Sequence, residues 1–170
     1  MRPLVVVLLA AAGAAGAQPT DWERQQKEGA WREREVVLPA YPTPEALIPF
    51  FVSATTESDF LVDGASLSVA DDGVVRYALV ARSRQGAQTV TYEGIRCSTG
   101  EYRIYATGAG GQWTPLKAPW RKIEPRSTQR WHNALHKEYF CPLGNPIRDA
   151  AEGVDALRRG DHPARRPSGD

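Results

Sequence analysis

The chain has 170 residues, of which 42% are apolar and 24% charged, and these fractions are typical of a globular protein rather than a disordered one. Its 21 basic and 20 acidic side chains leave a formal net charge of +1. Because neutralising phosphates requires a basic surface, this balance argues against a nucleic-acid partner bound through bulk charge.

The N-terminus has the pattern of a secretory signal peptide. Met1-Arg2 precedes an apolar run from Leu4 to about Ala15, and the small triplet Ala15-Gly16-Ala17 suits cleavage just before Gln18. The run is about twelve residues long, short of the roughly 20 that a spanning helix needs, so we expect no transmembrane span. An uncleaved anchor helix is the alternative interpretation.

We expect the mature protein to be periplasmic and without a lipid anchor, because no cysteine precedes Cys97 to carry one. Removal of residues 1–17 takes away Arg2, one of the 21 basic side chains, and leaves 20 basic and 20 acidic ones. The predicted organisation is a signal peptide at 1–17, a charged arm or helix at 18–35, a single α+β domain at 36–159 and a disordered tail at 160–170.

Short elements are predicted before the sheet. Residues 21–37 alternate charges of both signs, which is typical of a solvated helix or half-ordered arm. Residues 36–39 suit a short extended piece. Thr43 and Pro44 then suit the cap and the first position of a short helix, which Pro49 ends early.

The middle of the chain carries the clearest structural signal, a series of strands separated by turn-rich breaks. Every second residue from Val75 to Ala81 is apolar and shares one face, and the same holds from Tyr102 to Ala106. Short breaks of this kind join antiparallel neighbours. We therefore expect a meander of about four to five strands with one face partly wet, at residues 60–70, 73–82, 88–97, 101–107 and, as a last edge strand, 112–115.

The first of two predicted C-terminal helices follows Pro125. Ser127 or Thr128 can cap it. Trp131, Leu135 and Tyr139 recur at steps of four and form an apolar stripe that would cover the sheet.

The second helix is predicted to begin with Asn145 as its cap and Pro146 at its first position, and to end at Gly160. Apolar residues recur at helical spacing from Ile147 to Leu157. Strands followed by helices, rather than alternating with them, indicate the α+β class.

Cys97 and Cys141 are predicted to form a disulfide, because the leader directs them to an oxidising compartment. The bond would close a loop of about 45 residues, which the chain-entropy account values at roughly 4 kcal/mol. It would join the end of the first helix to the strand that ends at Cys97. A metal pair, a free thiol pair and a catalytic thiol compete with this interpretation, although metal-binding cysteines usually come in short clustered spacings.

A set of motifs lies along the domain, VRYALV at 75–80, YEGIRC at 92–97, GEYRIYA at 100–106 and YFC at 139–141, with Trp113 and Trp120. Together they resemble the cryptic neisserial protein-like family of exported bacterial proteins, over roughly residues 31–156. The resemblance implies a periplasmic location and assigns no activity. Many members are described as lipoproteins, a version from which this chain departs because it lacks the lipid-acceptor cysteine.

His132 and His136 stand four residues apart on the predicted helix, so both rings would project from one face at a spacing compatible with a metal. A zinc-protease helix would place glutamate directly after the first histidine, and Asn133 occupies that position. A third ligand would have to come from Glu138 or His162. A metal-dependent hydrolase is thus the alternative function, while we expect no metal and no cofactor.

Glu93 and Glu101, with Arg96 and Arg103, are the candidates for acid-base chemistry on the sheet. Charged residues on strands usually form the wet face, and alternation points Glu93 away from Arg96. No acid-base pair is fixed by these positions, and the sequence has no Gly-x-Ser-x-Gly elbow or phosphate-binding lysine loop. We therefore expect a protein that is not an enzyme and has no catalytic residues.

The segment from Lys117 to Lys137 is basic and is interleaved with tryptophan. Guanidinium groups pair with phosphate or carboxylate and indole rings stack on sugars, so this composition favours an anionic or glycan partner. In the envelope such a partner is a glycan, an anionic lipid or a protein. The alternatives are a solvated basic segment whose tryptophans pack on the core, and a nucleic-acid binder that uses this same segment. The candidate partner-binding residues are Trp113, Trp120, Arg103, Lys117, Arg121 and Lys122.

Overall fold

The computed structural model describes residues 31–124 and 130–165. The chain divides into two units, Met1–Arg32 and Glu33–Asp170, and every described helix and strand belongs to the second. The predicted signal peptide, most of the charged arm and the caps Ser127 and Thr128 lie outside the described residues.

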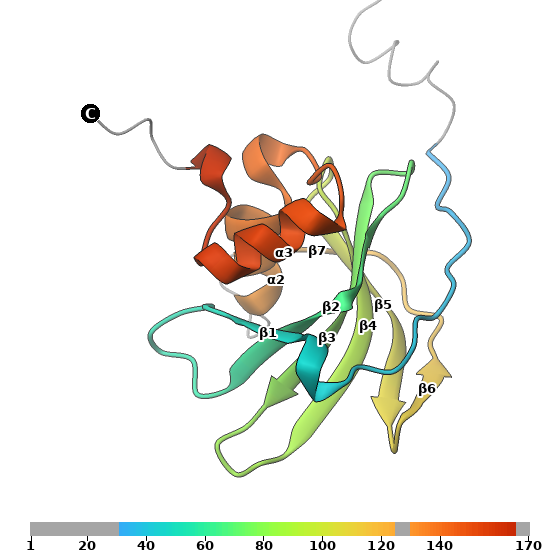
Figure 1. Cartoon of the computed structure of the whole chain (residues 1–170). Helices are drawn as coiled ribbons and strands as arrows, with labels where there is room; N and C mark the ends of the chain where they lie inside the picture. The colour runs from blue at the N-terminus through green and yellow to red at the C-terminus, as the bar shows by residue number, and fades with distance from the viewer. Residues whose placement is uncertain (1–30, 125–129, 166–170) are drawn as a thin grey trace, which may run out of the picture. The chain divides into compact units, whose positions relative to one another are not determined.

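One antiparallel sheet forms the centre of the second unit (Figure 1). Six strands follow one another in chain order as a meander, and a two-residue seventh strand pairs with the fifth. The predicted α+β meander is confirmed, with the first and seventh strands as additions. The strands are β1 (Leu47–Phe50), β2 (Asp59–Val69), β3 (Val74–Arg82), β4 (Gln88–Arg96), β5 (Glu101–Ala109), β6 (Gln112–Pro115) and β7 (Arg121–Lys122).

The short helix predicted before the sheet is replaced in part by β1. A single 3-10 turn, η1 (Pro44–Ala46), forms, and Leu47 then begins the strand. Pro49 lies inside β1, in register with Leu61 of β2. Proline is tolerated there because β1 is an edge strand, where one missing N–H need not break a ladder.

The C-terminal helices cover one face of the sheet (Figure 1). The predicted stripe is confirmed, since Trp131, Leu135 and Tyr139 all pack in the core between helices and sheet. None of the helices among the described residues has the length and apolar character to cross a membrane. The helical segments are α2 (Arg130–Ala134), its π-helical continuation η2 (Leu135–Phe140), η3 (Pro142–Gly144), α3 (Ala150–Arg159) and η4 (Pro163–Arg165).

The start of α3 differs from the prediction. Asp149 is the N-cap, and its side chain accepts the backbone N–H of Glu152 at 2.9 Å. Asn145, the predicted cap, has extended backbone and follows η3 instead. Ile147 therefore lies before the helix, although it is still buried in the core. Gly160 ends the helix with a positive φ, as predicted.

The folded domain extends past residue 159, into the segment assigned from the sequence to a disordered tail. His162 is buried, and its backbone N–H donates to the carbonyl of Glu138 at 2.7 Å. The His162 ring lies 3.0 Å from the carboxylate of Glu152. These two contacts hold the described residues after α3 against the domain.

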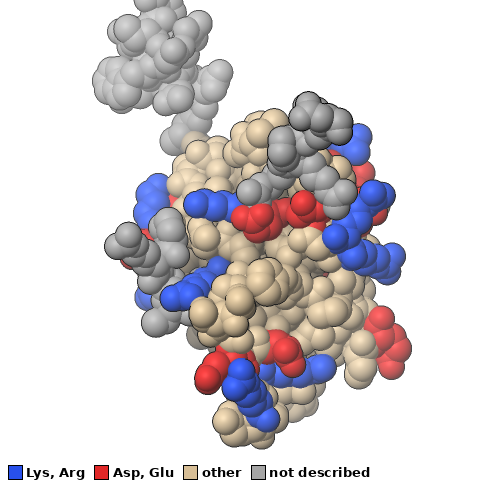
Figure 2. Space-filling model, turned by 90° about the vertical axis from the view of Figure 1, so that its left-hand side faces the viewer, with Lys and Arg blue, Asp and Glu red and all other residues tan. Residues whose placement is uncertain are grey.

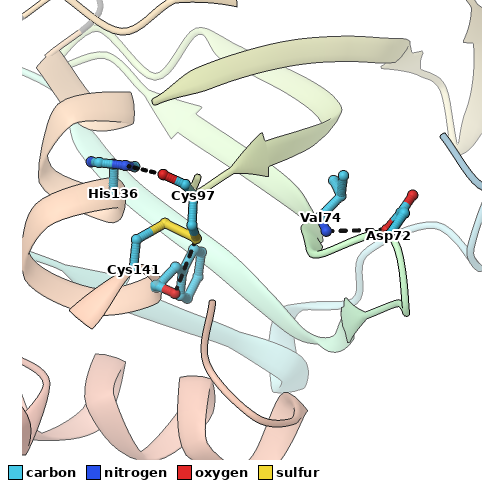
Figure 3. The surroundings of a disulfide bond; sticks show 6 residues. Asp72, Val74, Cys97, His136 and Cys141 are labelled. Atoms are coloured by element: carbon cyan, nitrogen blue, oxygen red, sulfur yellow. Dashed lines mark hydrogen bonds between the residues drawn. A yellow bond between two sulfur atoms is a disulfide. The ribbon is translucent and has the colours of Figure 1, made fainter. Parts of the chain in front are cut away.

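A disulfide joins Cys97, just after β4, to Cys141, just after η2 (Figure 3). The predicted pairing is therefore confirmed. The His136 ring lies 3.3 Å from the carbonyl oxygen of Cys97, so a hydrogen bond adds to the covalent link between sheet and helix. Both links lie at the same end of β4.

A β-bulge in β5 shapes the second face of the sheet, the one opposite the helices. Glu93 pairs with Ile104 while Tyr92 pairs with Ala106, so Tyr105 is an extra residue in β5. Tyr105 and Ala106 consequently both lie in a second buried cluster, whereas Ile104 packs toward the helices. The predicted alternation is wrong at Ala106 because of this extra residue.

The N-terminal residues of the domain lie against this second face (Figure 1). We call residues 33–39 the strap; they form neither helix nor strand. Val36 and Leu38 pack against the second cluster, which Ala78, Tyr92, Tyr105 and Ala106 form. The second face is thus partly covered by a segment that precedes the sheet in sequence.

Candidate anion-binding site

Polar side chains converge on one carboxylate at the second face, that of Glu33 in the strap. Arg103 Nη1 donates to Oε2 at 2.6 Å, and the Tyr105 hydroxyl donates to Oε1 at 2.7 Å. Trp120 Nε1 donates to Oε2 at 3.4 Å, and Arg76 Nη2 lies 3.9 Å from Oε1. The Glu33 side chain is only 16% exposed, so these groups largely replace water around its charge.

Gly94 sets the spacing of this site, because it is the register partner of both Arg76 on β3 and Arg103 on β5. The Tyr105 ring lies over it: a Cβ at residue 94 would come within 2.5 Å of the Tyr105 hydroxyl oxygen. Both guanidinium carbons lie 5.7 Å from the centre of that ring. The missing side chain therefore lets the bulged tyrosine lie near two arginines.

Asp72, in the turn between β2 and β3, fixes Arg76. The Arg76 Nη1 and Nη2 atoms donate to Oδ1 at 3.2 Å and to Oδ2 at 2.5 Å. Burial alone would raise the pKa of Asp72, but the bonds from Arg76, Arg34 and Val74 hold it below its ordinary value. Burial would likewise lower the pKa of Arg76, and the bond to Asp72 raises it instead. The two charges thus neutralise each other.

Glu33 and Arg103 form the second pair of opposite charges at this site. Since Asp72 is paired with Arg76, loss of Glu33 would leave Arg103 without its carboxylate and would free the hydroxyl donor of Tyr105. Burial, and then the bond to Glu33, raises the pKa of Tyr105, so its hydroxyl stays a donor at neutral pH. Such a set of donors suits a carboxylate or a phosphate group.

A hollow of about 410 Å³ opens beside the Glu33 carboxylate. Arg103 and Tyr105 contribute to its polar lining, and both also contact Glu33. Leu116 is 40% exposed and contributes to its apolar lining. A ligand there would meet charge and apolar surface together. The complete lining is Glu33, Arg34, Val36, Leu38, Arg103, Tyr105, Pro115 and Leu116.

The structure brings three of the six predicted partner-binding residues to this face. Arg103 and Trp120 contact Glu33, and half-buried Trp113 packs in the same cluster, where its Nε1 donates to the carbonyl of Pro39 at 2.9 Å. The other three are exposed, and none of them donates to Glu33 within the described part of the chain. They are Lys117, Arg121 and Lys122.

Three residues of the site, Glu33, Arg76 and Tyr105, are missing from the sequence prediction. Arg76 and Tyr105 fall on predicted strands but carry no local sign of their pairing, and Glu33 falls in the predicted solvated arm. Gly94 is the one available signal, because a glycine inside a strand often marks close approach of another group.

The predicted histidine pair does not share a site. His132 is 1% exposed, and its Nε2 lies 2.8 Å from Oε2 of Glu93 inside the core. His136 instead points its Nε2 at the carbonyl of Cys97 (Figure 3). Over residues 31–124 and 130–165, no three His, Cys, Asp or Glu side chains gather as metal ligands would. The geometry therefore offers these two rings no common ligand position.

Glu93 lies inside the core rather than on the expected wet face. Besides His132, the hydroxyls of Tyr77 and Thr91 donate to its carboxylate at 3.1 and 2.7 Å. Burial would raise the pKa of Glu93, but the charge and hydrogen bond of His132, together with these hydroxyls, hold it below its ordinary value. Arg103, another of the four acid-base candidates, contacts Glu33 on the opposite face, so the sheet separates it from Glu93.

The charged groups are mixed in sign on the face shown in Figure 2, where acidic groups lie among the basic ones. This arrangement agrees with the near-equal numbers of basic and acidic side chains, 21 and 20. Among the described residues of that face, no broad basic surface of the kind that binds nucleic acid stands out.

The sequence profile of the CNP1-like family matches residues 26–158. The match spans the strap, the whole sheet and nearly all of α3, and it includes both cysteines. No curated protein and no solved structure matches the chain. Over its folded domain, this chain belongs to the CNP1-like family.

Proposed function

We propose that this protein is an exported, non-enzymatic component of the cell envelope that binds an anionic partner at the Glu33 site. The observation that carries the proposal is the convergence of Arg103, Tyr105 and Trp120 on one carboxylate. Charge-assisted donors of this kind recognise carboxylate and phosphate groups. The hollow of about 410 Å³ beside them gives room and apolar contact for the rest of a ligand.

The proposed export of the chain supports a partner in the envelope. The predicted signal peptide would export the chain, and the disulfide between Cys97 and Cys141 suits an oxidising compartment. Anionic groups there include carboxylates of glycans and proteins and phosphates of lipids. These grounds support a periplasmic location as part of the proposal.

The burial and protonation of the candidate catalytic groups support a non-enzymatic role. Glu93 and His132 are paired inside the core, each about 1% exposed, where a substrate has no access. At the Glu33 site the raised pKa of Tyr105 keeps its proton in place. The groups that face a bound anion are therefore donors that hold it, rather than a base that would react with it.

A ¹⁵N NMR titration of the purified protein with sodium succinate tests the proposal, with sodium chloride at equal ionic strength as the reference. An added anion competes with Glu33, whose tethered carboxylate has an effective concentration on the order of millimolar, so the titration must extend well above that range. The expected result is a saturable shift of the Trp120 indole N–H and of the Arg103 and Tyr105 amides.

Matched variants locate the effect. Arg103→Gln should remove the succinate-specific shifts, whereas Arg121→Gln makes the same change at an exposed position on β7 and should preserve them. Shifts that chloride reproduces, or that persist in Arg103→Gln, would overturn the proposal.

A further inference from the structure

We propose that the strap is an internal ligand of the Glu33 site, and that the external partner is an extended acidic peptide segment of another protein, which takes the strap's place. This inference rests on the proposed function, because it names the partner of the same site. The strap would then compete with the external segment for the site.

The strap is held in the way that a bound peptide is held. A charged anchor, Glu33, enters the donor cluster, and Val36 and Leu38 pack on the second buried cluster. One main-chain group is also recognised, because Trp113 Nε1 donates to the carbonyl of Pro39 at 2.9 Å. An acidic residue followed three and five positions later by aliphatic ones therefore describes the ligand.

Side chains, rather than main-chain hydrogen bonds, hold the strap in place. Within the described residues, its main chain makes no backbone-to-backbone hydrogen bond, and the Arg34 N–H donates instead to a side chain, that of Asp72, at 2.9 Å. Glu35 is exposed, and so is Val37, at 78%. Segments with few main-chain bonds and exposed side chains open locally at low free-energy cost.

Once the strap has left, the aromatic side chains of the Glu33 site favour a peptide over a glycan. The Trp113 ring is already packed near Tyr41 and Tyr92, at centroid distances of 5.2 and 6.1 Å. The Trp120 ring lies edge-on to Tyr105 at 6.4 Å. These indoles thus serve as packing and as donors, which leaves them poorly placed as platforms for sugar rings.

The charge of the vacated site also favours a peptide over a lipid surface. Because Asp72 stays bound to Arg76, release of Glu33 frees the single positive charge of Arg103. One cation alone binds an anionic membrane only weakly, whereas it matches one carboxylate in a peptide. The apolar contacts of Val36 and Leu38 complete that match.

Fluorescence anisotropy with a dye-labelled peptide of the sequence at residues 31–41 tests the inference on the purified protein. The wild type should bind this peptide weakly, because the tethered strap competes. Glu33→Gln removes the charged anchor and should bind it about tenfold more tightly. Glu35→Gln makes the same change at an exposed neighbour and should bind as the wild type does.

Two further measurements identify the contacts. A peptide with Gln in place of its first Glu, the position of Glu33, should bind the Glu33→Gln protein about tenfold more weakly than the unaltered peptide. Adding Arg103→Gln to that protein should cause a similar loss, with circular dichroism to confirm its fold. Equal affinities of wild type, Glu33→Gln and Glu35→Gln would overturn the inference.

Together, the succinate, peptide and vesicle assays distinguish a wrong peptide assignment from a wrong anion site. If succinate shifts the Trp120 indole signal but the peptide binds no variant, the anion site stands and the peptide assignment is wrong. If phosphatidylglycerol vesicles capture Glu33→Gln in an Arg103-dependent way while the peptide does not bind, the partner is a lipid. If neither succinate nor the peptide binds, both proposals fail.

Discussion

Residue 94 shows how one position can determine a site without contacting the ligand. Gly94 lies in register with Arg76 and Arg103, and the bulge in β5 brings the Tyr105 ring over it. A side chain there would occupy the space of that ring. The donors around Glu33 therefore depend on a residue that contributes no polar group.

Gly94→Ala is expected to displace Tyr105, because the added Cβ would lie 2.5 Å from its hydroxyl oxygen and 2.9 Å from a Val74 methyl carbon. Overpacking of this kind lowers the free energy of unfolding by about 1–3 kcal/mol. Urea unfolding measures the loss, and the succinate titration should show a weaker Trp120 shift. Thr89→Ala, at an exposed position of β4, is the control and should change neither. An unaltered Gly94→Ala protein would contradict this role.

The buried pair of Glu93 and His132 is expected to stabilise the fold. Glu93→Gln leaves His132 in the core without its carboxylate, and breaking such a pair costs about 3 kcal/mol of unfolding free energy. Urea unfolding at neutral pH measures it. Glu57→Gln is the control: Glu57 is 80% exposed and 3.9 Å from Arg84, so its loss should have almost no effect.

The same pair predicts a pH dependence. The folded-state pKa of Glu93 lies below the unfolded value of 4.5, so its ionised form stabilises the fold above about pH 4.5. This contribution is lost as the pH falls through the lower, folded-state pKa. The stability difference between wild type and Glu93→Gln should accordingly shrink in acid. A difference that stays constant from neutral to strongly acidic pH would contradict the assignment.

The sequence predicts side-chain direction well where only the period of a strand matters. Val75, Tyr77 and Leu79 face the core, as expected from alternation. Tyr105 was unpredictable from a local pattern because a bulge depends on how two strands pair. Glu33 was unpredictable for a related reason: its contact with Arg103 spans 70 residues of sequence.

At the scale of elements, the disulfide and the strap connect the sheet to the segments on its two faces. The strands were predictable because their alternation and turn residues are local, and β1 was missed because Pro49 resembles a helix end. The cap of α3 was misplaced because two polar residues, Asn145 and Asp149, both suit that role. Backbone geometry selects Asp149.

Removing the disulfide with the double variant Cys97→Ala/Cys141→Ala should lower the free energy of unfolding by about 4 kcal/mol, since the closed loop spans a sequence separation of 44. Urea unfolding of the double variant and of the wild type measures this. Dithiothreitol should lower the wild-type midpoint toward that of the variant and leave the variant unchanged. Equal midpoints for wild type and variant would show that the link does not stabilise the fold.

At the scale of the whole molecule, export and oxidation predict the mass of the protein isolated from the envelope. Intact-mass measurement should give the chain from Gln18, less two hydrogens for the bond between Cys97 and Cys141. Alkylation without reduction should add nothing. A mass that retains residues 1–17, or the uptake of two alkyl groups, would contradict the proposed route to the periplasm.

In our proposal the strap occupies a site that an acidic segment of another protein can take in its place. Hydrogen exchange of backbone amides tests it most directly, with and without a saturating amount of the peptide of residues 31–41. We predict that peptide binding speeds exchange at Arg34, whose N–H donates to Asp72, and leaves the amides of β3 and β4 as protected as before. Unchanged protection at Arg34 under saturating peptide would contradict the claim.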